Sequence, residues 1–237
     1  HVWIQASYNP ILDMNGKVIK TIADIHATMA KIAIDDLSKG IYTAKIKKDN
    51  KDIKVLDLMT GMGETWDIIK NNFPNATIDA LDYSDTMVEK ATIKKSQLNL
   101  SHLNVIHENI LKNKIESNSY DVITCAFGIK TFDKLQTEQF AKQVYRILKP
   151  GGYITFIEIS VPQNIILKKL FGFYTGTIIP FIGKILLGNP ENYKMLWKYT
   201  LSFKNCDEAL DIFQEQGFKL QRESYFFDCS TGFYGTK

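Results

Sequence analysis

The stretch Asp57-Leu58-Met59-Thr60-Gly61-Met62-Gly63 decides the fold, because it ends a run of apolar residues and precedes a helical pattern. Residues 53–59 are apolar at almost every position, which is typical of a strand covered on both faces. The two glycines let the backbone turn tightly and approach a ligand, and the next helix points its first amides toward that ligand. The alternative is a plain strand-to-helix turn, since Gly-x-Gly loops occur in many nucleotide-binding proteins.

Short apolar segments continue to alternate with helical patterns after this loop. Strands are predicted at 53–59, 76–81, 103–107, 121–127 and 153–160, and helices at 64–73, after Ser84, at 136–148 and at 207–216. The last two strands, 219–228 and 230–235, have no room for a helix between them and are expected to form a hairpin-like pair. This alternation predicts an α/β fold: a Rossmann-like, doubly wound sheet of seven mostly parallel strands.

Two regions do not follow the alternation. Residues 162–203 contain apolar and aromatic segments without a strand, and we expect them to form a helical lid inserted over the carboxyl ends of the strands. Residues 1–45 are expected to be a helical cap on the ligand site, and the remnant of a PAS sensor domain is the alternative. The main domain is then expected over residues 46–237.

Composition limits the function classes. The 237 residues are 45% hydrophobic and 23% charged, as in an ordinary globular protein. The net charge of +3, with only two arginines, argues against nucleic acid as a partner. Three widely spaced cysteines predict neither a disulfide framework nor a metal site, so a reducing cytoplasm is expected. No signal peptide or membrane-spanning segment is predicted.

Asp82 makes the glycine loop more informative. It ends the second predicted strand, where an acid can accept hydrogen bonds from both ribose hydroxyls of an adenosine. A nicotinamide dehydrogenase would have the same spacing, but Trp66 occupies the place of its third glycine and would crowd a pyrophosphate. Asp57 could in addition pair with an amino-acid ammonium group. These residues favour S-adenosylmethionine as the cofactor, with S-adenosylhomocysteine as the product.

The remaining cofactor contacts are expected at the ends of the other strands. A polar side chain at Asn109 could bind an adenine edge, and the fourth strand ends at the switch point of the sheet. The predicted cofactor-binding residues are Asp57, Thr60, Gly61, Met62, Gly63, Asp82, Tyr83, Met87, Asn109, Ile110, Cys125 and Ala126.

Several motifs resemble class I methyltransferases: Leu-Asp-Leu-x-Thr-Gly-x-Gly at 56–63, Leu-Asp-Tyr-Ser at 81–84 and Leu-Lys-Pro-Gly-Gly at 148–152. More narrowly, the chain is similar to the ubiquinone/menaquinone biosynthesis C-methyltransferase family. The stretches that carry this resemblance are 123–129, 158–162, 173–184, 188–196 and 231–235, with a looser match at Tyr8-Asn9 and Asn15. The resemblance implies methyl transfer to a small aromatic, apolar acceptor such as a prenylated quinol precursor.

The chain departs from this family on the acceptor side. Lys130-Thr131 stands where the family has Arg-Asn, and Lys cannot reproduce the planar fork of donors of Arg. Phe233-Tyr234-Gly235 replaces a His-x-Gly sequence, and Met195 replaces a tyrosine. A small-molecule O-, N- or C-methyltransferase outside quinone biosynthesis therefore stays open, as does a catalytically silent cofactor-binding module.

Candidate residues for the acceptor follow from the chemistry of a hydroquinone. Methylation at carbon requires the ring to become a phenolate, so a base or a polarising cation helps. Lys130 and His107 are the predicted catalytic residues, and His26 is a further candidate. The predicted acceptor pocket comprises Tyr8, Phe127, Lys130, Thr131, Phe173, Tyr174 and Tyr193.

The apolar segment between Leu167 and Ile185, with Lys168, Lys169 and Lys184 beside it, has two interpretations. It is either a lid helix that belongs to the core, or a wall of the acceptor pocket whose lysine-flanked side contacts a membrane surface. The expected location is therefore the cytoplasm, with peripheral contact to the inner membrane face in the second case. The sequence leaves a homodimer open.

Overall fold

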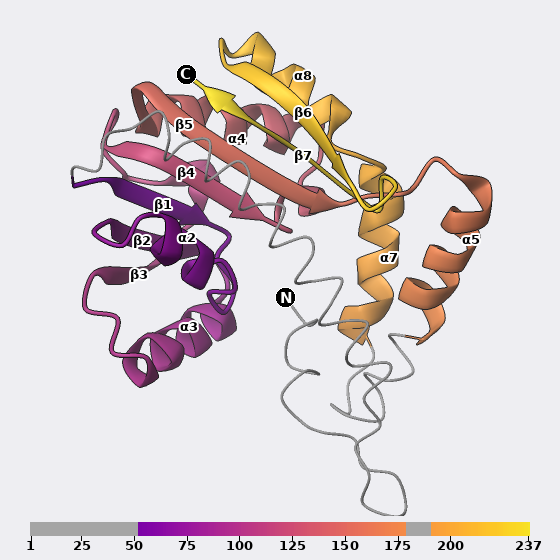
Figure 1. Ribbon diagram of the computed structural model, residues 1–237, viewed down its shortest axis with the longest axis horizontal. Coiled ribbons are helices and arrows are strands. Elements are labelled where there is room, and N and C mark those ends of the chain that lie inside the picture. Colours follow the sequence, from indigo (N-terminus) through magenta and orange to yellow (C-terminus); the bar gives the residue numbers. More distant parts are fainter. Residues whose placement is uncertain (1–51, 179–190) are drawn as a thin grey trace, which may run out of the picture.

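The computed structural model describes residues 52–178 and 191–237, with side chains from 197 onward in the second range. One sheet of seven strands forms its centre, in the order β3-β2-β1-β4-β5-β7-β6 (Figure 1). The strands are β1 (Lys54–Leu58), β2 (Thr77–Asp82), β3 (Leu103–His107), β4 (Tyr120–Ala126), β5 (Leu148–Ile159), β6 (Lys219–Tyr225) and β7 (Ser230–Thr236).

The strands β1 to β5 are parallel, and β7 runs antiparallel to both β5 and β6. This is the mostly parallel, doubly wound sheet that the alternation of elements predicts. The chain moves outward from β1 to β3 and then returns to place β4 on the other side of β1. The carboxyl ends of β1 and β4 therefore form the switch point, where sheets of this kind bind ligands.

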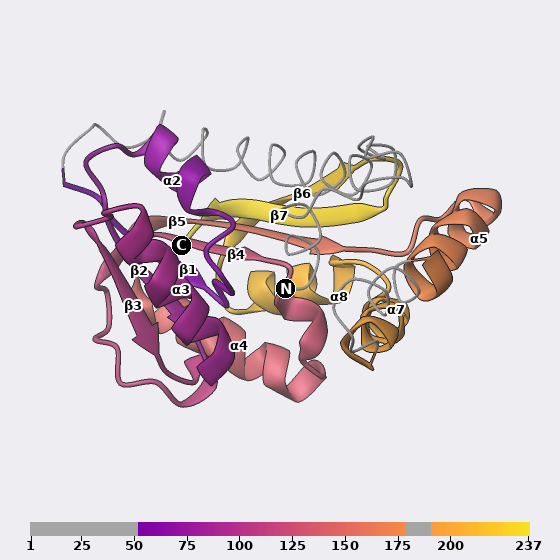
Figure 2. The same cartoon turned by 90° about the horizontal axis from the view of Figure 1, so that it is seen from below.

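Helices cover both faces of the sheet (Figure 2). The helices on the faces are α2 (Trp66–Asn72), α3 (Asp85–Gln97), α4 (Lys134–Ile147) and α8 (Asp207–Glu215), and two further helices are α5 (Ile165–Phe173) and α7 (Glu191–Phe203). Short turns of helix occur at η2 (Ile110–Lys112), η3 (Ile129–Thr131) and the π-helical η4 (Tyr174–Ile178). Among the described residues, no helix is long and apolar enough to cross a membrane.

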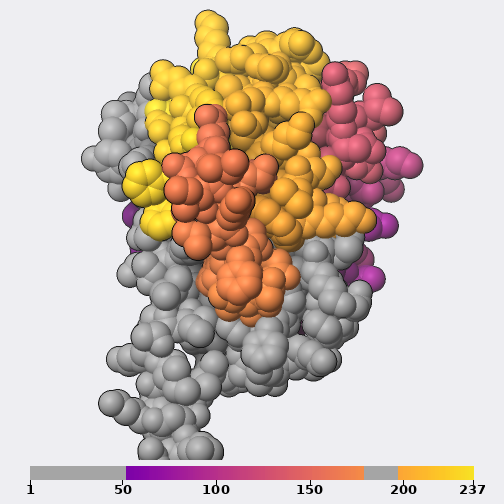
Figure 3. Space-filling view, turned by 90° about the vertical axis from the view of Figure 1, so that its right-hand side faces the viewer, coloured from indigo at the N-terminus to yellow at the C-terminus, as the bar shows by residue number. Residues whose placement is uncertain are grey.

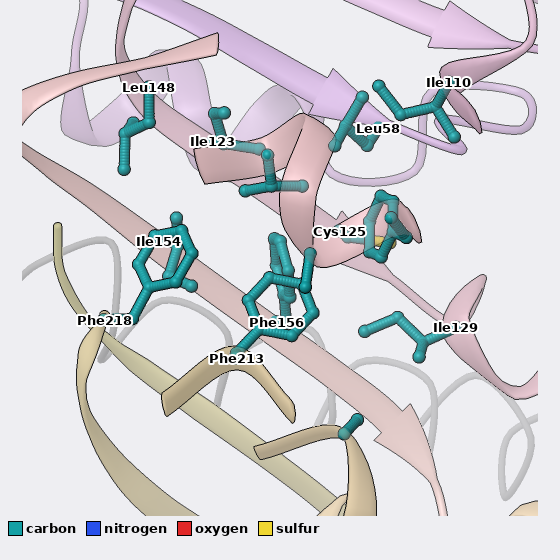
Figure 4. Close-up of a cluster of buried hydrophobic side chains, with 14 of the residues drawn as sticks. Leu58, Ile110, Ile123, Cys125, Ile129, Leu148, Ile154, Phe156, Phe213 and Phe218 are labelled. Atoms are coloured by element: carbon teal, nitrogen blue, oxygen red, sulfur yellow. The ribbon is translucent and has the colours of Figure 1, made fainter. Parts of the chain in front are cut away.

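Two buried clusters correspond to the two faces of the sheet. Phe140 of α4 and Phe213 of α8 pack against Ile123, Ile154 and Phe156 of the central strands on one face (Figure 4). Trp66 and Ile69 of α2 and Ala91 of α3 belong to the cluster on the other face. Successive side chains of a strand point to opposite faces, so a strand that contributes to both clusters must be apolar at every position.

The structure differs from the sequence prediction by one or more residues at several boundaries, and three of these differences have a clear local cause. Helix α4 begins at Lys134 because Asp133 and Gln136 form a capping box. Strand β5 begins at Leu148, so that Pro150-Gly151-Gly152 lies within the strand and not before it, next to an irregularity in the pairing with β4. Strand β6 ends at Tyr225 and not at 228, because the next three residues have positive φ angles.

Helices α5 and α7 extend beyond the end of the sheet where the central parallel strands end (Figure 1). They lie within the segment predicted as the inserted lid, and α7 contacts η3, which follows β4. Phe171 meets Trp197 edge to face, and a Cβ at Gly172 would come within 2.8 Å of the Trp197 ring. Small residues on α5 thus allow close packing on α7. The predicted N-terminal cap, or PAS remnant, lies outside the described residues.

Candidate cofactor and acceptor site

The loop after β1 has the backbone conformation that its glycines predict. Gly61 and Gly63 have φ angles of 58° and 82°, in the left-handed region that favours glycine. A Cβ at Gly63 would lie 2.4 Å from the Trp66 ring, so no larger residue fits there. The loop is therefore both tightly turned and closely packed against the start of α2.

Asp57 organises this loop from inside. Its carboxylate is fully buried and accepts hydrogen bonds from the hydroxyls of Thr60 (2.5 Å), Thr65 (2.6 Å) and Thr124 (2.6 Å). Burial raises the pKa of Asp57 above its ordinary value, although the three hydroxyls act in the opposite direction. These contacts connect β1, the loop, the residue before α2 and β4. The predicted contact of Asp57 with an ammonium group stays a prediction.

Trp66 fills the space that a third glycine would leave open. Its side chain is buried against Gly63, and its Nε1 donates a hydrogen bond to the Thr60 hydroxyl at 2.8 Å. Lys94 of α3 donates to the carbonyl of Gly63 at 2.6 Å and lies over the Trp66 ring. The Trp66 ring thus packs against the glycine loop in the place where a dinucleotide-binding loop has its third glycine. The loop therefore suits a ligand without a pyrophosphate.

Asp82, at the end of β2, fits the ribose of an adenosine. Each carboxylate oxygen accepts one backbone hydrogen bond at 2.9 Å, Oδ2 from Gly61 and Oδ1 from Ser84. A carboxylate has about four lone-pair sites, so each oxygen can accept one further hydrogen bond. Two vicinal hydroxyls present two such donors. The same contacts also fix the carboxylate relative to the glycine loop.

Glu64 is a site residue that the sequence prediction missed. Its Oε1 is buried, and no donor among the described residues hydrogen-bonds to it. Burial raises the pKa of this carboxyl group above its ordinary value. Glu64 directly follows Gly63, so a buried acceptor lies at the end of the glycine loop. The acid directly after the Gly-x-Gly sequence was the available signal.

The side chains after β2 and β3 surround the expected adenine position. Tyr83 is 71% exposed, Met87 is half-buried, and Asn109 Oδ1 accepts a hydrogen bond from the Leu111 amide. Asn109 is thus the N-cap of η2, which positions the backbone of the loop after β3. Tyr83 and Asn109 follow the neighbouring strands β2 and β3, and Met87 lies in the first turn of α3; their contact with an adenine stays a prediction.

Cys125 and Ile110 point into the protein core. Both belong to the cluster under α4 and α8 (Figure 4), and burial raises the pKa of the Cys125 thiol well above its ordinary value. Only their backbone atoms can face a ligand. Ala126 is half-buried and packs against the cluster on the other face of the sheet. The small size of Cys125 and Ala126 serves packing, because β4 is covered on both faces.

The structure does not bring the two predicted catalytic residues together. His107 ends β3, where its Nε2 lies 3.0 Å from the Tyr83 carbonyl and 3.4 Å from Asp85. Lys130 follows β4, which is separated from β3 by β2 and β1. Three strand spacings correspond to roughly 14 Å. His107 therefore lies beside Asp82, its partner in the sheet, whereas Lys130 lies on the other side of β1.

Lys130 forms a buried ion pair with Glu158 of β5. The Lys130 ammonium lies 3.0 Å from Glu158 Oε1 and also donates to the Phe127 carbonyl. Glu158 is 1% exposed and accepts two backbone hydrogen bonds as well, from the amides of Lys130 (3.1 Å) and Ile159 (2.8 Å). This pair fixes the turn after β4, in which Phe127 has a φ of 63°. The sequence prediction included Lys130 but missed Glu158.

The other predicted pocket residues are dispersed. Thr131 is exposed and donates to the Gly128 carbonyl, and Phe173 is exposed on α5. Tyr174 is half-buried, and burial raises the pKa of its hydroxyl. Tyr8, His26 and the side chain of Tyr193 lie outside the described residues. The sequence prediction also missed Thr65 and Thr124, which hold Asp57, because nothing in their local pattern distinguishes them from ordinary threonines.

Relatives of known name share this arrangement of elements. The ubiE/COQ5 methyltransferase family matches residues 13–234. The chain is 29% identical to a demethylmenaquinone methyltransferase of Lactococcus lactis over 177 residues, which are 74% of this chain and 69% of the relative. It is 30% identical to a demethylmenaquinone methyltransferase of Thermotoga maritima over 183 residues, or 77% of each chain.

Solved structures with low sequence identity have the same fold. A SAM-dependent methyltransferase from Aquifex aeolicus superimposes with a TM-score of 0.60 at 17% identity, covering 89% of this chain and 92% of that one. Phosphoethanolamine N-methyltransferase 2 of Haemonchus contortus, in complex with S-adenosyl-L-methionine, gives 0.55 at 17% identity over 77% and 38% of the two chains. The glycine loop, Asp82 and the match over almost the whole length lead to one conclusion: the chain belongs to the ubiE/COQ5 methyltransferase family, within the class I S-adenosylmethionine-dependent methyltransferases.

Proposed function

We propose that the protein methylates a ring carbon of a prenylated hydroquinone precursor, with S-adenosylmethionine as the donor. The observation that carries the proposal is the family match over residues 13–234. Relatives that are named demethylmenaquinone methyltransferases support it. The apolar character of the helices beyond the carboxyl ends of β4 and β5 supports an apolar acceptor. The acceptor itself is the part of this proposal that an experiment has to establish.

The donor side of the reaction depends on positioning. S-adenosylmethionine supplies an electrophilic methyl group on a sulfonium, and its transfer is an in-line displacement. Asp82 would bind the ribose, and Glu64 would bind the ammonium group. The glycine loop, which the contacts of Asp57 hold in place, would bind the part of the cofactor between these two groups. Asp82 ends β2 and the loop follows β1, so the residues that would hold the donor lie on the β1–β2 side of the site, and the side at β4 and β5 is left for the acceptor. Fixing this geometry is the main contribution of the protein to the rate.

The acceptor side is expected beside the turn after β4. Glu158 and Lys130 hold this turn, and α7 contacts η3 directly after it. The Lys130 ammonium is already engaged by Glu158 and by the Phe127 carbonyl, so we assign Lys130 the role of positioning the turn.

The test is incubation of the purified protein with isotope-labelled S-adenosylmethionine and a reduced demethylmenaquinone, followed by mass spectrometry of the product. A product that is heavier by one labelled methyl group, with the label on a ring carbon, is the expected result. Asp82→Asn should lose most of this activity at low donor concentration, and Asp85→Asn is the matched control on the same turn. Donor binding without methylation of any prenylated hydroquinone would contradict the proposed acceptor.

A second candidate function follows from the residues at the acceptor end. Lys130-Thr131 stands where the family carries Arg-Asn, so an acceptor that needs the planar Arg fork would be bound less well. A different small aromatic acceptor, methylated on O, N or C, is the alternative. Incubation of the protein with labelled donor and a cell extract would identify it, because the label marks the methylated product whatever its chemical class.

A further inference from the structure

Six large apolar side chains are exposed at one end of the molecule, on α5 and on the turn between β6 and β7. They are Ile165 (69% exposed), Ile166 (67%), Leu170 (62%), Phe173 (59%), Phe226 (42%) and Phe227 (79%). Figure 3 views this end directly, with α5 in orange and the β6–β7 turn in bright yellow beside it. We call these six residues the α5 surface. Exposed apolar patches of this kind usually mark an interaction site.

Packing inside the protein does not require the outer face of α5 to be apolar. The inner face is formed by Phe171, which packs on Trp197, and by Gly172, which lies against the same ring. Ile166, Leu170 and Phe173 follow the spacing i, i+4 and i+7, and therefore lie on one side of the helix. They are all exposed. The helix thus has one apolar side for the protein and a second one for a partner.

The β6–β7 turn exposes its two aromatic rings in an unfavourable backbone conformation. Phe226, Phe227 and Asp228 have φ angles of 48°, 55° and 65°, in the left-handed region that is unfavourable for residues other than glycine. The Ser224 hydroxyl holds Asp228, and the amide of Ser160 donates to the carbonyl of Cys229 at 2.9 Å. The second bond ties the turn to the chain that leads into α5. A strained turn that exposes phenylalanine indicates a function for the exposed rings.

The charges around the α5 surface identify the partner. Lys168 and Lys169 are exposed on α5, and the sequence contains no acidic residue between Glu158 and Glu191. The acid of the β6–β7 turn is Asp228, and it is engaged by Ser224 and by Arg222, whose Nη2 lies 3.9 Å away. Apolar side chains with lysines beside them match the interface of an anionic bilayer, where apolar groups enter the headgroup region and lysines meet phosphates. A surface for a protein partner would not require lysines beside its exposed apolar side chains.

We propose that the α5 surface docks the protein on an anionic lipid bilayer. Phe227 and the apolar side chains of α5 enter the interface, and Lys169, three residues after Ile166 and four before Phe173 on the same side of the helix, contacts lipid phosphates, while Lys168 adds to the positive charge of the helix. Helix α5 follows the carboxyl end of β5, so this docking directs the acceptor end of the site toward the membrane. The docking depends on lipid alone, and it does not rest on the acceptor proposed above.

The test is sedimentation of the full chain with vesicles that contain neither quinone nor S-adenosylmethionine. One set consists of phosphatidylcholine and the other of phosphatidylcholine with phosphatidylglycerol. We expect the protein to sediment with the anionic vesicles, and the bound fraction to fall as salt is added, because screening weakens the contribution of the lysines. Binding to neither set, or equal binding to both sets at every salt concentration, would overturn the proposal.

Three variants test which residues are responsible. Leu170→Glu combined with Phe227→Glu should weaken binding roughly tenfold to hundredfold, since each of these side chains loses its apolar burial. Lys168→Glu combined with Lys169→Glu should remove the preference for anionic vesicles. Ile93→Glu is the control, because Ile93 is 50% exposed on α3, at the other end of the sheet (Figure 1). An equal loss for Ile93→Glu would contradict the assignment to the α5 surface.

Three further measurements keep the outcomes separate. All of the substituted side chains are exposed, so thermal unfolding should show that the variants fold like the unchanged protein. Sedimentation velocity without vesicles should show no self-association that Leu170→Glu removes, because such an association would mean that a second copy covers the surface. Methylation of a detergent-solubilised acceptor reports on the proposed function alone, so that either proposal can fail without the other.

Discussion

Single carboxylates at the ends of the strands have two different tasks. Asp57 accepts three threonine hydroxyls and is fully buried, so its role in the structure is to hold the loop. Asp82 accepts one backbone amide at each oxygen and keeps capacity for two more donors. Both aspartates lie at or near the end of a strand in the sequence. The local pattern predicts that they matter, but only their contacts distinguish the two tasks.

Asp82→Asn should weaken binding of S-adenosylmethionine roughly tenfold to hundredfold, because the amide group can accept at only one of its two positions and the charge is lost. Asp85→Asn should leave the affinity nearly unchanged, since that side chain is 94% exposed. Titration calorimetry measures both. Equal affinity of the Asp82 variant and the unchanged protein would mean that the ribose lies elsewhere.

Glu158→Ala should lower the free energy of unfolding by about 3–5 kcal/mol, because it leaves the Lys130 ammonium buried without its partner. Glu158→Gln should cost less, since the amide oxygen still accepts a backbone hydrogen bond. Lys149→Ala, which removes the half-exposed Lys149–Asp121 pair at 2.8 Å, should cost at most about 1 kcal/mol. Urea unfolding of the three variants gives the comparison. A similar small cost in all three would show that the buried pair is not important for stability.

At the scale of elements, the existence and order of the strands and helices follow from periodicity, and their ends follow from local hydrogen bonds. The apolar runs of β1, β4 and β5 predict buried parallel strands, and the structure confirms them. Helix α4 begins two residues earlier than its apolar pattern predicts. The Asp133–Gln136 capping box sets this start, and the box is visible in the sequence as an acid three residues before a glutamine.

Asp133→Ala should destabilise the protein by about 1 kcal/mol, because the amide of Gln136 loses its acceptor at the N-terminus of α4. Lys134→Ala is a suitable control, since it changes an exposed residue of the same turn without removing a cap. Thermal or urea unfolding measures the difference. Identical stability of both variants would show that α4 is held by its buried face alone.

At the scale of the molecule, Asp79 connects four strands. This side chain of β2 accepts hydrogen bonds from Tyr120 of β4 (2.6 Å) and Asn104 of β3 (2.8 Å), and it lies 3.1 Å from the ammonium of Lys54 of β1. Burial alone would raise the pKa of Asp79, but these hydrogen bonds and the Lys54 charge lower it below its ordinary value of 3.8. The ionised form is therefore favoured in the folded state.

Asp79 gives a prediction for the pH dependence of stability. A folded-state pKa below the unfolded value means that the stabilisation is fully present above pH 3.8 and is lost as the pH falls toward the lower, folded-state pKa. Asp79→Asn should thus be less stable than the unchanged protein at neutral pH, and its stability should fall less on acidification in that low pH range. Urea unfolding as a function of pH measures both curves. Parallel curves for the two proteins would show that another group controls the acid transition.

The fold class, the glycine loop with Asp82 and the family can be predicted from the sequence alone, because they depend on local periodicity and on residues at fixed distances along the chain. The partners of Asp57, the pairing of Lys130 with Glu158 and the exposed side of α5 are visible only in the folded protein. Thr124 lies 67 residues from Asp57, and Glu158 lies 28 residues from Lys130. Such contacts arise when parallel strands bring their carboxyl ends together, and no local pattern encodes which side chains then meet.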